Sequence, residues 1–586
     1  MKKFVALALS LGLVGTVVPP PVSANEGWNG SKKIKHVLLI SIDGMHAVDY
    51  ENCLAANTCP NLAALGRTGV HYTRTTTSRP SDSFPGLMAL VTGGSPRTVG
   101  AYYDVAYDRV LAPPTVATGN GLPAGNCVEG TINGTQTEYE EGNEIDQSKL
   151  NGGFPGYSLT DGGVKSIDPN KLVRDPFNHC KPVYSWNFVR TNTIFGVIHA
   201  SGGYTAWSDK HAGYAVVSGP TGTNQPSNVD DYYSPEVNSL QIVLPGLKTA
   251  ALTPSGSVDC GAIVPNGDDW TTDFDAIKCY DQLKVNAVVN WINGKTHLGG
   301  SRAPVPVIFG MNFQAVSVGQ KLISPKSAVR TDANSGGYED AAGTPRPKML
   351  AEIQFVDAAI GQMVAALKQN DLIDSTAVII TAKHGQSPID PNRFFPIPGN
   401  SGANGTPPSG IIPSLLPAVY SDPNNGLGLA EDDISQIWLA NSNTTADAVT
   451  KLENAGTEIG LGQIYYGASL SAIFGVPGVP NHPGPCCRLR DGGDPRTPDI
   501  VVIPNVGVVY TGNLKKQSEH GGFAWDDTNV MLLVSAPGCH EGQTLHAFVE
   551  TAQVAPTILQ LLGLDPDTLD AVRQEGTPVL PGLGLE

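Results

Sequence analysis

Short apolar runs recur along the chain, and polar side chains that could take part in catalysis lie next to three of them. Ile34–Asp43 reads IKHVLLISID and Ala377–Gly385 reads AVIITAKHG, and the run VMLLV follows Ser518–Gly522. Runs this apolar are typical of strands buried on both faces of a parallel sheet. Ligands of open α/β sheets bind outside the carboxyl ends of the strands. The pattern therefore predicts an α/β fold in which Asp43 and His384 lie at one edge of the sheet.

Other segments extend this picture. Further strands are expected at Val70–Thr77, Asn192–His199, Val305–Phe313, Asp499–Pro504 and Val530–Ser535. The clearest helix is Ile353–Leu372, whose apolar residues recur with a period of 3.6. Shorter helices are expected at Cys59–Gly69, Tyr280–Ile292 and Glu550–Leu562. Strands that alternate with helices favour a mostly parallel sheet.

Stretches rich in Gly, Pro and Asn interrupt this alternation near residues 111–180, 217–300 and 396–480. They show little periodicity, which is typical of loops inserted into a domain. We interpret residues 25–586 as one catalytic domain that carries these three insertions. Within the third, a strand-helix-strand pattern around Thr445–Ala455 predicts a small cap.

Residues 1–24 have the pattern of a signal peptide. Lys2 and Lys3 precede the apolar stretch Phe4–Val18, and the small residues Val22–Ala24 offer a cleavage site. Pro19–Pro21 ends the apolar stretch before the roughly 20 residues that a membrane-spanning helix needs. We expect a secreted or periplasmic protein with no transmembrane segment after cleavage.

Nine cysteines in an exported chain predict disulfides. Cys53 and Cys59 bracket a short loop, Cys260 and Cys279 bracket a polar insert, and Cys127 can meet Cys180. The remaining three, Cys486, Cys487 and Cys539, leave an odd thiol. No C-x-x-C pair suggests a metal site instead. The connectivity does not follow from the sequence.

Charge and missing motifs exclude several classes of function. The net charge of −17 argues against binding of a nucleic-acid duplex, because the phosphate backbone attracts basic surfaces. No G-x-S-x-G elbow of an α/β-hydrolase is present, and no complete phosphate-binding P-loop.

A candidate nucleophile stands where a turn leads into a helix. Ser83 lies in R-P-S-D-S-F-P-G, and the helix ends near Thr92–Gly94. The unpaired N–H groups at a helix N-terminus favour phosphate oxygens. A purely structural role is also open, because Ser83 could cap the helix, and Ser81 or Asp82 could do so equally well.

The motif order D-G, S-F-P-G, V-T-G-G, H-G and H-G-G resembles the nucleotide pyrophosphatase/phosphodiesterase branch of the alkaline phosphatase superfamily. The resemblance covers most of residues 34–110, 190–215, 303–395 and 495–580. It implies an alkaline-phosphatase-like three-layer α/β/α sandwich with a mostly parallel central sheet. It also implies that Ser83 is the nucleophile, and that the metal ligands are Asp43, Ser83, His384 and His520.

Several of the ligands that the resemblance implies are absent. Lys383 replaces a ligand carboxylate, and Val316 and Gln320 replace a carboxylate and a histidine. Gly86 stands where the family often has Asn. The remaining ligands are too few for two zinc ions, since each catalytic ion takes three or more. We therefore expect one divalent ion at most, most naturally zinc, or none, with Lys383 as a second catalytic residue that supplies positive charge.

The resulting hypothesis is an exported phosphoric-ester hydrolase, similar to a phosphodiesterase or nucleotide pyrophosphatase, that acts on a small phosphate ester. Two alternatives stay open: a non-catalytic binding protein on the same fold, and a transferase with one metal ion. The resemblance also places Tyr102, Tyr103, Tyr204 and Trp207 near the substrate, where they either stack on a base or pack in the core. The oligomeric state does not follow from the sequence.

Overall fold

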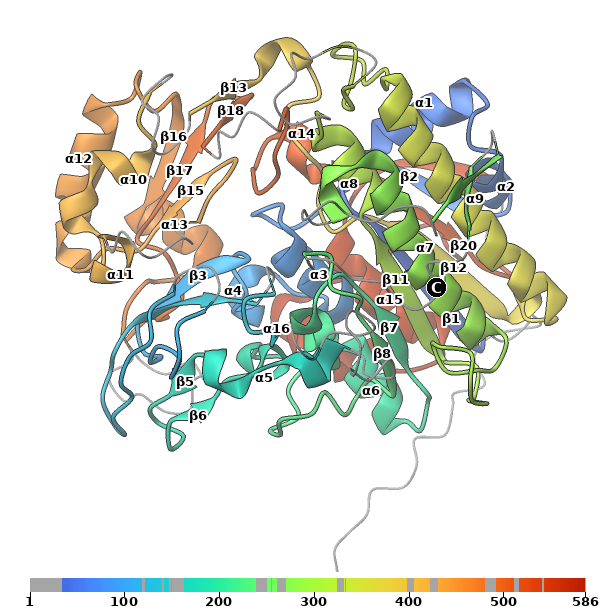
Figure 1. Cartoon of the computed structure of the whole chain (residues 1–586), viewed down its shortest axis with the longest axis horizontal. Coiled ribbons are helices and arrows are strands. Elements are labelled where there is room, and N and C mark those ends of the chain that lie inside the picture. The colour runs from blue at the N-terminus through green and yellow to red at the C-terminus, as the bar shows by residue number, and fades with distance from the viewer. Residues whose placement is uncertain are drawn as a thin grey trace, which may run out of the picture.

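The computed structural model describes most of the chain (Figure 1), namely residues 34–118, 122–139, 142–146, 149, 163–238, 250–253, 256–260, 270–323, 331, 334–397, 405–421, 430–479, 492–510, 516–539 and 542–584. The expected signal peptide and the pair Cys486 and Cys487 lie outside the described residues.

A sheet of nine strands forms the centre of the part of the chain that is described. Its central strand β1 pairs in parallel with β11 and β12, and β7 and β8 continue the parallel arrangement. The antiparallel pairs involve β19 and β20. The order is β19 (Asn529–Val530), β2 (Val70–Thr76), β20 (Leu533–Ser535), β12 (Thr376–Thr381), β1 (His36–Ile42), β11 (Ile308–Phe313), β7 (Ala206–Ser208) and β8 (Asp231–Tyr233), and β21 (Gln543–Glu550) pairs with β2.

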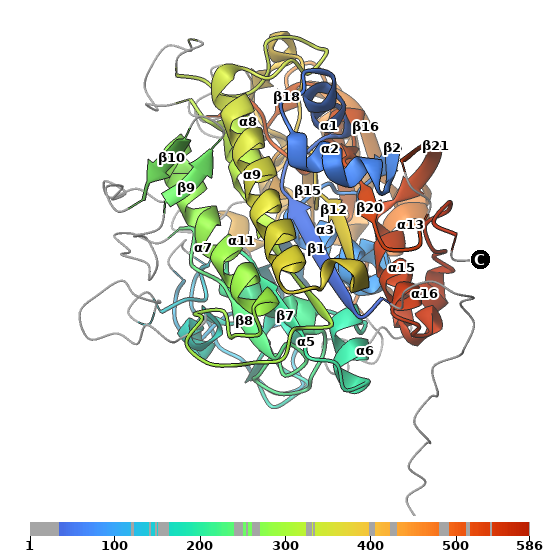
Figure 2. The same cartoon turned by 90° about the vertical axis from the view of Figure 1, so that its right-hand side faces the viewer.

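Helices cover both faces of this sheet, and Figure 2 shows α7 and α9 on one side of β1 and α15 on the other. One layer contains α2 (Pro60–Arg67), α7 (Phe274–Ile292), α8 (Ala315–Lys321) and α9 (Pro347–Gln369). The other contains α3 (Ser83–Thr92), α6 (Ile194–Ala200), α15 (Val554–Leu561) and α16 (Asp570–Glu575). The predicted three-layer α/β/α fold with a mostly parallel sheet is confirmed.

Most of the predicted elements are present, and α9 is longer than its apolar pattern suggests. It begins at Pro347, because proline is well suited to the first turn of a helix. Its length and composition would also suit a membrane span, but it packs against α7, α8 and α2 and most of its apolar window is buried. It is therefore a core helix.

One strand prediction was wrong, and another predicted strand lies outside the main sheet. The segment Asn192–His199 contains helix α6, whose first turn is capped by Thr193: its hydroxyl accepts a hydrogen bond from the N–H of Gly196 at 3.2 Å. A short apolar run fits a buried helix as well as a strand, and here the N-cap residue Thr193 favours the helix. The segment Asp499–Pro504 does contain a strand, but that strand belongs to a different sheet.

This second sheet lies apart from the main one, on the left of Figure 1. Its four strands, in spatial order, are β14 (Ala430–Glu431), β15 (Ser435–Ile437), β17 (Ile500–Pro504) and β16 (Leu461–Tyr466). Helices α12 (Thr445–Asn454) and α13 (Gly467–Phe474) pack on it around apolar clusters of their own. We call residues 430–504 the cap. It contacts the main sheet's domain through Asp433, whose N–H donates to the carbonyl of His520 at 3.4 Å.

Three disulfides join cysteines that the sequence analysis considered together. They are Cys53–Cys59, Cys127–Cys180 and Cys260–Cys279. Cys539 is the free and buried cysteine among the described residues.

Candidate active site

Asp43 ends β1 at the carboxyl edge of the main sheet. Gly44 follows it with a φ of +80°, which lets the chain turn sharply where the strand stops. The Asp43 carboxylate is buried and accepts two short hydrogen bonds from the end of β11. Asn312 Nδ2 donates to Oδ1 at 2.7 Å, and Gln314 Nε2 donates to Oδ2 at 2.6 Å. Both carboxylate oxygens therefore already have amide partners.

The end of β12, which neighbours β1, adds two cationic or basic groups. Lys383 Nζ lies 3.4 Å from Asp43 Oδ2 and 3.4 Å from Asp209 Oδ1, and His384 Nε2 lies 3.5 Å from Asp43 Oδ2. Burial alone would raise the pKa of Asp43, but Lys383 and His384 outweigh it and hold this pKa well below the usual value. Asp43 is thus a fixed anion.

Ser83 opens helix α3 but does not cap it. The N-cap is Asp82, whose carboxylate accepts from the N–H of Ser83 at 2.6 Å and of Phe84 at 3.4 Å. This excludes the structural role that the sequence left open for Ser83. It also corrects the expectation that these N–H groups face a phosphate, because Asp82 already occupies them.

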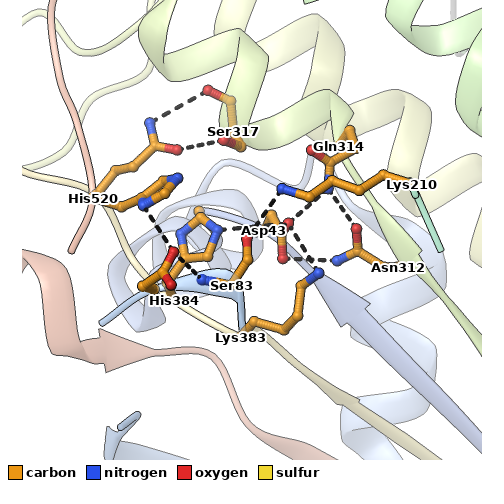
Figure 3. A network of polar contacts seen from close by, with 12 residues as sticks. Asp43, Ser83, Lys210, Asn312, Gln314, Ser317, Lys383, His384 and His520 are labelled. Carbon is orange, nitrogen blue, oxygen red and sulfur yellow. Dashed lines mark hydrogen bonds and ion pairs between the residues drawn. The ribbon is translucent and has the colours of Figure 1, made fainter. Parts of the chain in front are cut away.

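The Ser83 hydroxyl instead faces the charged groups (Figure 3). Its Oγ lies 3.5 Å from Asp43 Oδ2 and accepts a hydrogen bond from Lys210 Nζ at 3.2 Å. Lys210 follows β7, two strands from β1, so it reaches the same edge of the sheet. Sequence reasoning missed Lys210; the usable signal was its place in the stretch S-D-K-H, directly after a strand.

Histidines form the opposite side of the group. The rings of His384 and His520 are 4.0 Å apart between centroids, and His520 Nδ1 lies 3.7 Å from Asp82 Oδ2. Burial, reinforced by Lys321 and His384, holds the pKa of His520 well below its usual value, so its ring is neutral at physiological pH. The structure thus brings together all five residues that the sequence predicts: Asp43, Ser83, Lys383, His384 and His520.

These residues do not fit the two metal ions that the resemblance implies. Among the described residues, no group of three His, Cys, Asp or Glu side chains is arranged to hold an ion. Both oxygens of Asp43 hold amide hydrogens, and an ammonium stands beside it. Amide side chains occupy the neighbouring space: Gln320 Nε2 donates to the carbonyl of Gly44 at 2.6 Å and to Tyr338 Oη at 2.8 Å. Val316 is buried on α8.

Two other carboxylates near the late histidine motif serve different contacts. Asp526 accepts from the N–H of Ile389 at 2.9 Å. Asp527 shares a hydrogen bond with Asp433 of the cap. Neither is available to replace the missing ligands.

The aromatic residues that could have lined a substrate site mainly pack in the core. Tyr102 Oη donates to Asp494 at 3.0 Å, and Tyr103 Oη donates to Asp432 at 2.7 Å. Buried Trp207 donates from Nε1 to Asp209 Oδ2 at 3.0 Å and so holds the carboxylate that Lys383 contacts.

The reacting groups are enclosed in this structure. The exposed fraction of Ser83 and of Lys383 is 0%, and that of Lys210 is 8%. A substrate can reach Ser83 only if neighbouring segments move.

The sequence was compared with known protein families and with curated sequences. The sequence matches the family described as type I phosphodiesterase / nucleotide pyrophosphatase over residues 37–124 and 332–527. No curated protein sequence matches the chain.

Several solved structures are similar. Human ectonucleotide pyrophosphatase / phosphodiesterase 5 is 14% identical over 90% of this chain and 95% of its own, with a TM-score of 0.48. The inactive murine form in complex with AMP is 14% identical over 91% of this chain and 96% of its own, with a TM-score of 0.46. Alkaline phosphatase PafA is 12% identical over 91% and 96%, with a TM-score of 0.49.

The family match spans both strands whose ends carry Asp43 and His384, and it includes Ser83 and His520. Over these two segments the chain therefore matches the type I phosphodiesterase / nucleotide pyrophosphatase family.

Proposed function

We propose that this protein hydrolyses phosphoric esters with Ser83 as its nucleophile. The family match supports the reaction class. The assignment of Ser83 rests on the position of its hydroxyl. Asp82 caps helix α3, so the Ser83 hydroxyl does not, and it lies between Lys210 Nζ at 3.2 Å and Asp43 Oδ2 at 3.5 Å. A serine in a purely structural role would not need two charged partners for its hydroxyl.

In the first step, Ser83 Oγ forms a bond to phosphorus while the bond from phosphorus to the leaving oxygen breaks. The serine proton passes to water. In the second step a water oxygen attacks the phosphoserine, the bond to Oγ breaks, and Ser83 regains its proton. Lys383 stabilises the charge that develops on the other phosphate oxygens, because fixed charges in a dry site act strongly on a transition state.

The metal requirement is reduced in this proposal. If a divalent ion binds, Asp43, Ser83, His384 and His520 are the residues that would hold it, and its imidazole-rich donor set suits zinc. One ion is the upper limit, because the rest of the space is filled by amides and by Lys383.

The substrate class in this proposal is a small phosphate ester such as a nucleotide, in keeping with the activity for which the family is named. Export is part of the proposal too. Three disulfides and the pattern of residues 1–24 support it, since disulfides persist in oxidising compartments. N-terminal sequencing of native material should find a mature chain that begins near Asn25; intact Met1 on cytoplasmic protein would contradict export.

Ser83→Ala tests the nucleophile. Turnover of bis(4-nitrophenyl) phosphate and of 4-nitrophenyl phosphate should fall by roughly 1,000-fold or more, as for loss of other covalent nucleophiles. The melting temperature should barely change, since Asp82 still caps the N-terminus of α3. Ser471→Ala on α13 is the matched control and should keep full activity. Near-full activity of Ser83→Ala would refute the role of Ser83. A wild type that binds nucleotide without any turnover would instead favour a binding protein.

A further inference from the structure

We propose that two buried ammonium groups, on Lys210 and Lys383, take the place of the two divalent ions in this site, which therefore binds and transfers a phosphoryl group without a divalent metal. This inference rests on the proposed function and assigns its cationic groups.

The first support is a comparison of charge. Two divalent ions bring four positive charges to a site. At the positions that the resemblance matches, Val316 and Lys383 remove two carboxylates, and Lys383 adds one ammonium. Lys210 adds the second ammonium at the same edge of the sheet. The two missing carboxylates and the two ammonium groups present together amount to four positive charges, the same as two divalent ions.

The second support is the division of labour between the two lysines. Lys210 Nζ contacts the nucleophilic oxygen itself, at 3.2 Å from Ser83 Oγ. An ammonium at that distance stabilises the alkoxide form of Ser83, which is what a metal ion bound to a hydroxyl does. Lys383 Nζ instead contacts the carboxylates of Asp43 and Asp209, at 3.4 Å each, so it is a second ammonium beside the nucleophile's partner Asp43, and we assign it to the phosphate oxygens.

The third support is that the surroundings hold both lysines in place. Their Nζ atoms face the same ring: Lys383 lies 4.3 Å and Lys210 5.5 Å from the centroid of buried Tyr214. The face of an aromatic ring attracts cations. Asp209 pairs with Lys383 and is itself held by Trp207. Charged groups that are fixed before the substrate arrives need no reorganisation during the reaction.

The same contacts disfavour a metal ion at Asp43. Asn312 and Gln314 direct amide hydrogens at both of its oxygens, at 2.7 and 2.6 Å. A cation bound to Asp43 would have to displace them and would be repelled by the ammonium of Lys383. In this protein, Asp43 pairs with lysine where its counterparts would bind a metal.

The chemistry balances without an ion. The Ser83 proton passes to water as Oγ bonds to phosphorus, and the negative charge of the alkoxide is compensated by Lys210. The ester oxygen leaves with its electron pair, Lys383 compensates the charge on the non-bridging oxygens, and water later releases the phosphoryl group from Ser83.

Wild-type protein purified without chelator decides the question. Elemental analysis should find well under one divalent ion per chain. Turnover of bis(4-nitrophenyl) phosphate should stay within about twofold after treatment with EDTA and gel filtration, and added zinc should not increase it. Orthovanadate should raise the melting temperature equally before and after EDTA, which reports anion binding independently of turnover.

Variants then test the two lysines separately. Lys210→Met and Lys383→Met should each lower kcat/KM by about 100-fold or more, the usual effect of removing one stabilising donor from a transition state. Lys383→Met should also lose the stabilisation by vanadate. Lys368→Met, an exposed position on α9, is the control for loss of a charge and should behave as wild type. If the buried substitutions prevent folding, the chelator experiment on the wild type still decides.

The outcomes separate this inference from the function on which it rests. Activity and vanadate binding that disappear with EDTA and return with zinc would overturn the lysine proposal and leave the hydrolase proposal intact. Vanadate binding that survives EDTA without any turnover would support anion binding by the lysines, and would refute phosphoryl transfer and with it the hydrolase. Full activity of both lysine variants would also overturn the inference.

Discussion

A Cβ atom on Gly86 would lie 2.1 Å from the carbonyl oxygen of Lys383. Helix α3 therefore packs directly against the end of β12, and this close approach sets the distance between Ser83 on the helix and Lys383 on the strand. The same close approach leaves no space for a side chain at residue 86.

Gly86→Ala should accordingly lower the free energy of unfolding by roughly 1–3 kcal/mol, the usual effect of overpacking a tight site. It should also reduce turnover, because the helix must move away from Lys383. Gly300→Ala, with open space around its Cβ, is the control and should be close to neutral. Chemical denaturation measures both. A Gly86→Ala variant as stable and active as the wild type would show that helix and strand are not tightly coupled.

The sequence predicts the strands that carry Asp43 and His384 well, because β1 and β12 are buried on both faces and leave an uninterrupted apolar run. It fails at α6, where the decisive feature is a hydrogen bond from the N–H of Gly196 to the side chain of Thr193. A short apolar run alone cannot distinguish a strand from a helix in such a case.

The site residues that lie in family motifs could be predicted from the sequence. Lys210 could not, because its place beside Ser83 depends on the pairing of β7 with β11 and of β11 with β1. These are contacts between segments far apart in the sequence. The N-cap residue of α3 could not be predicted for a related reason. Ser81, Asp82 and Ser83 are all good N-cap residues, and only the three-dimensional path of the chain selects Asp82.

Asp82→Ala should destabilise the protein by about 1–2 kcal/mol, because two N–H groups of α3 lose their acceptor and Asp104 loses a third bond. It should also lower turnover, since the first turn of α3 orients Ser83. Asp273→Ala is the matched control: Asp273 caps α7 in the same way, away from the site. Both variants should lose stability in thermal denaturation, and only Asp82→Ala should lose activity. Equal activity of the two variants would show that the N-cap of α3 does not contribute to catalysis.

Cys539 should be unreactive in the folded protein. It is a free thiol, and burial raises its pKa to about 11, so it holds little of the reactive thiolate at pH 8. Iodoacetamide should label it in denatured protein and not in native protein. Peptide mapping of the same unreduced samples should recover the pairs Cys53–Cys59, Cys127–Cys180 and Cys260–Cys279. Rapid labelling of native Cys539, or free thiols at Cys53 and Cys59, would contradict the structure.

The contact between the cap and the main domain should weaken as the pH rises. Asp433 of the cap and Asp527 lie together against Gly522, and burial raises the pKa of Asp527 to about 7. Burial and the neighbouring Asp527 also raise the pKa of Asp433 well above its usual value. The folded protein thus keeps a proton between these carboxyls that the unfolded chain has lost above about pH 4.

The sign follows from this difference in bound protons. The folded state binds more protons than the unfolded state from about pH 4 to pH 7, so stability falls as the pH rises through that window, by at most about 1.4 kcal/mol per pH unit for one proton. Asp527→Asn replaces the protonated carboxyl with an amide that does not titrate. Relative to the wild type, its stability should therefore improve steadily from pH 5 to pH 7. Asp447→Asn, exposed on α12, is the control, and its difference from the wild type should not change in this way. Urea denaturation at each pH gives the comparison, and a constant difference between Asp527→Asn and the wild type would show that the two carboxyls do not share a proton.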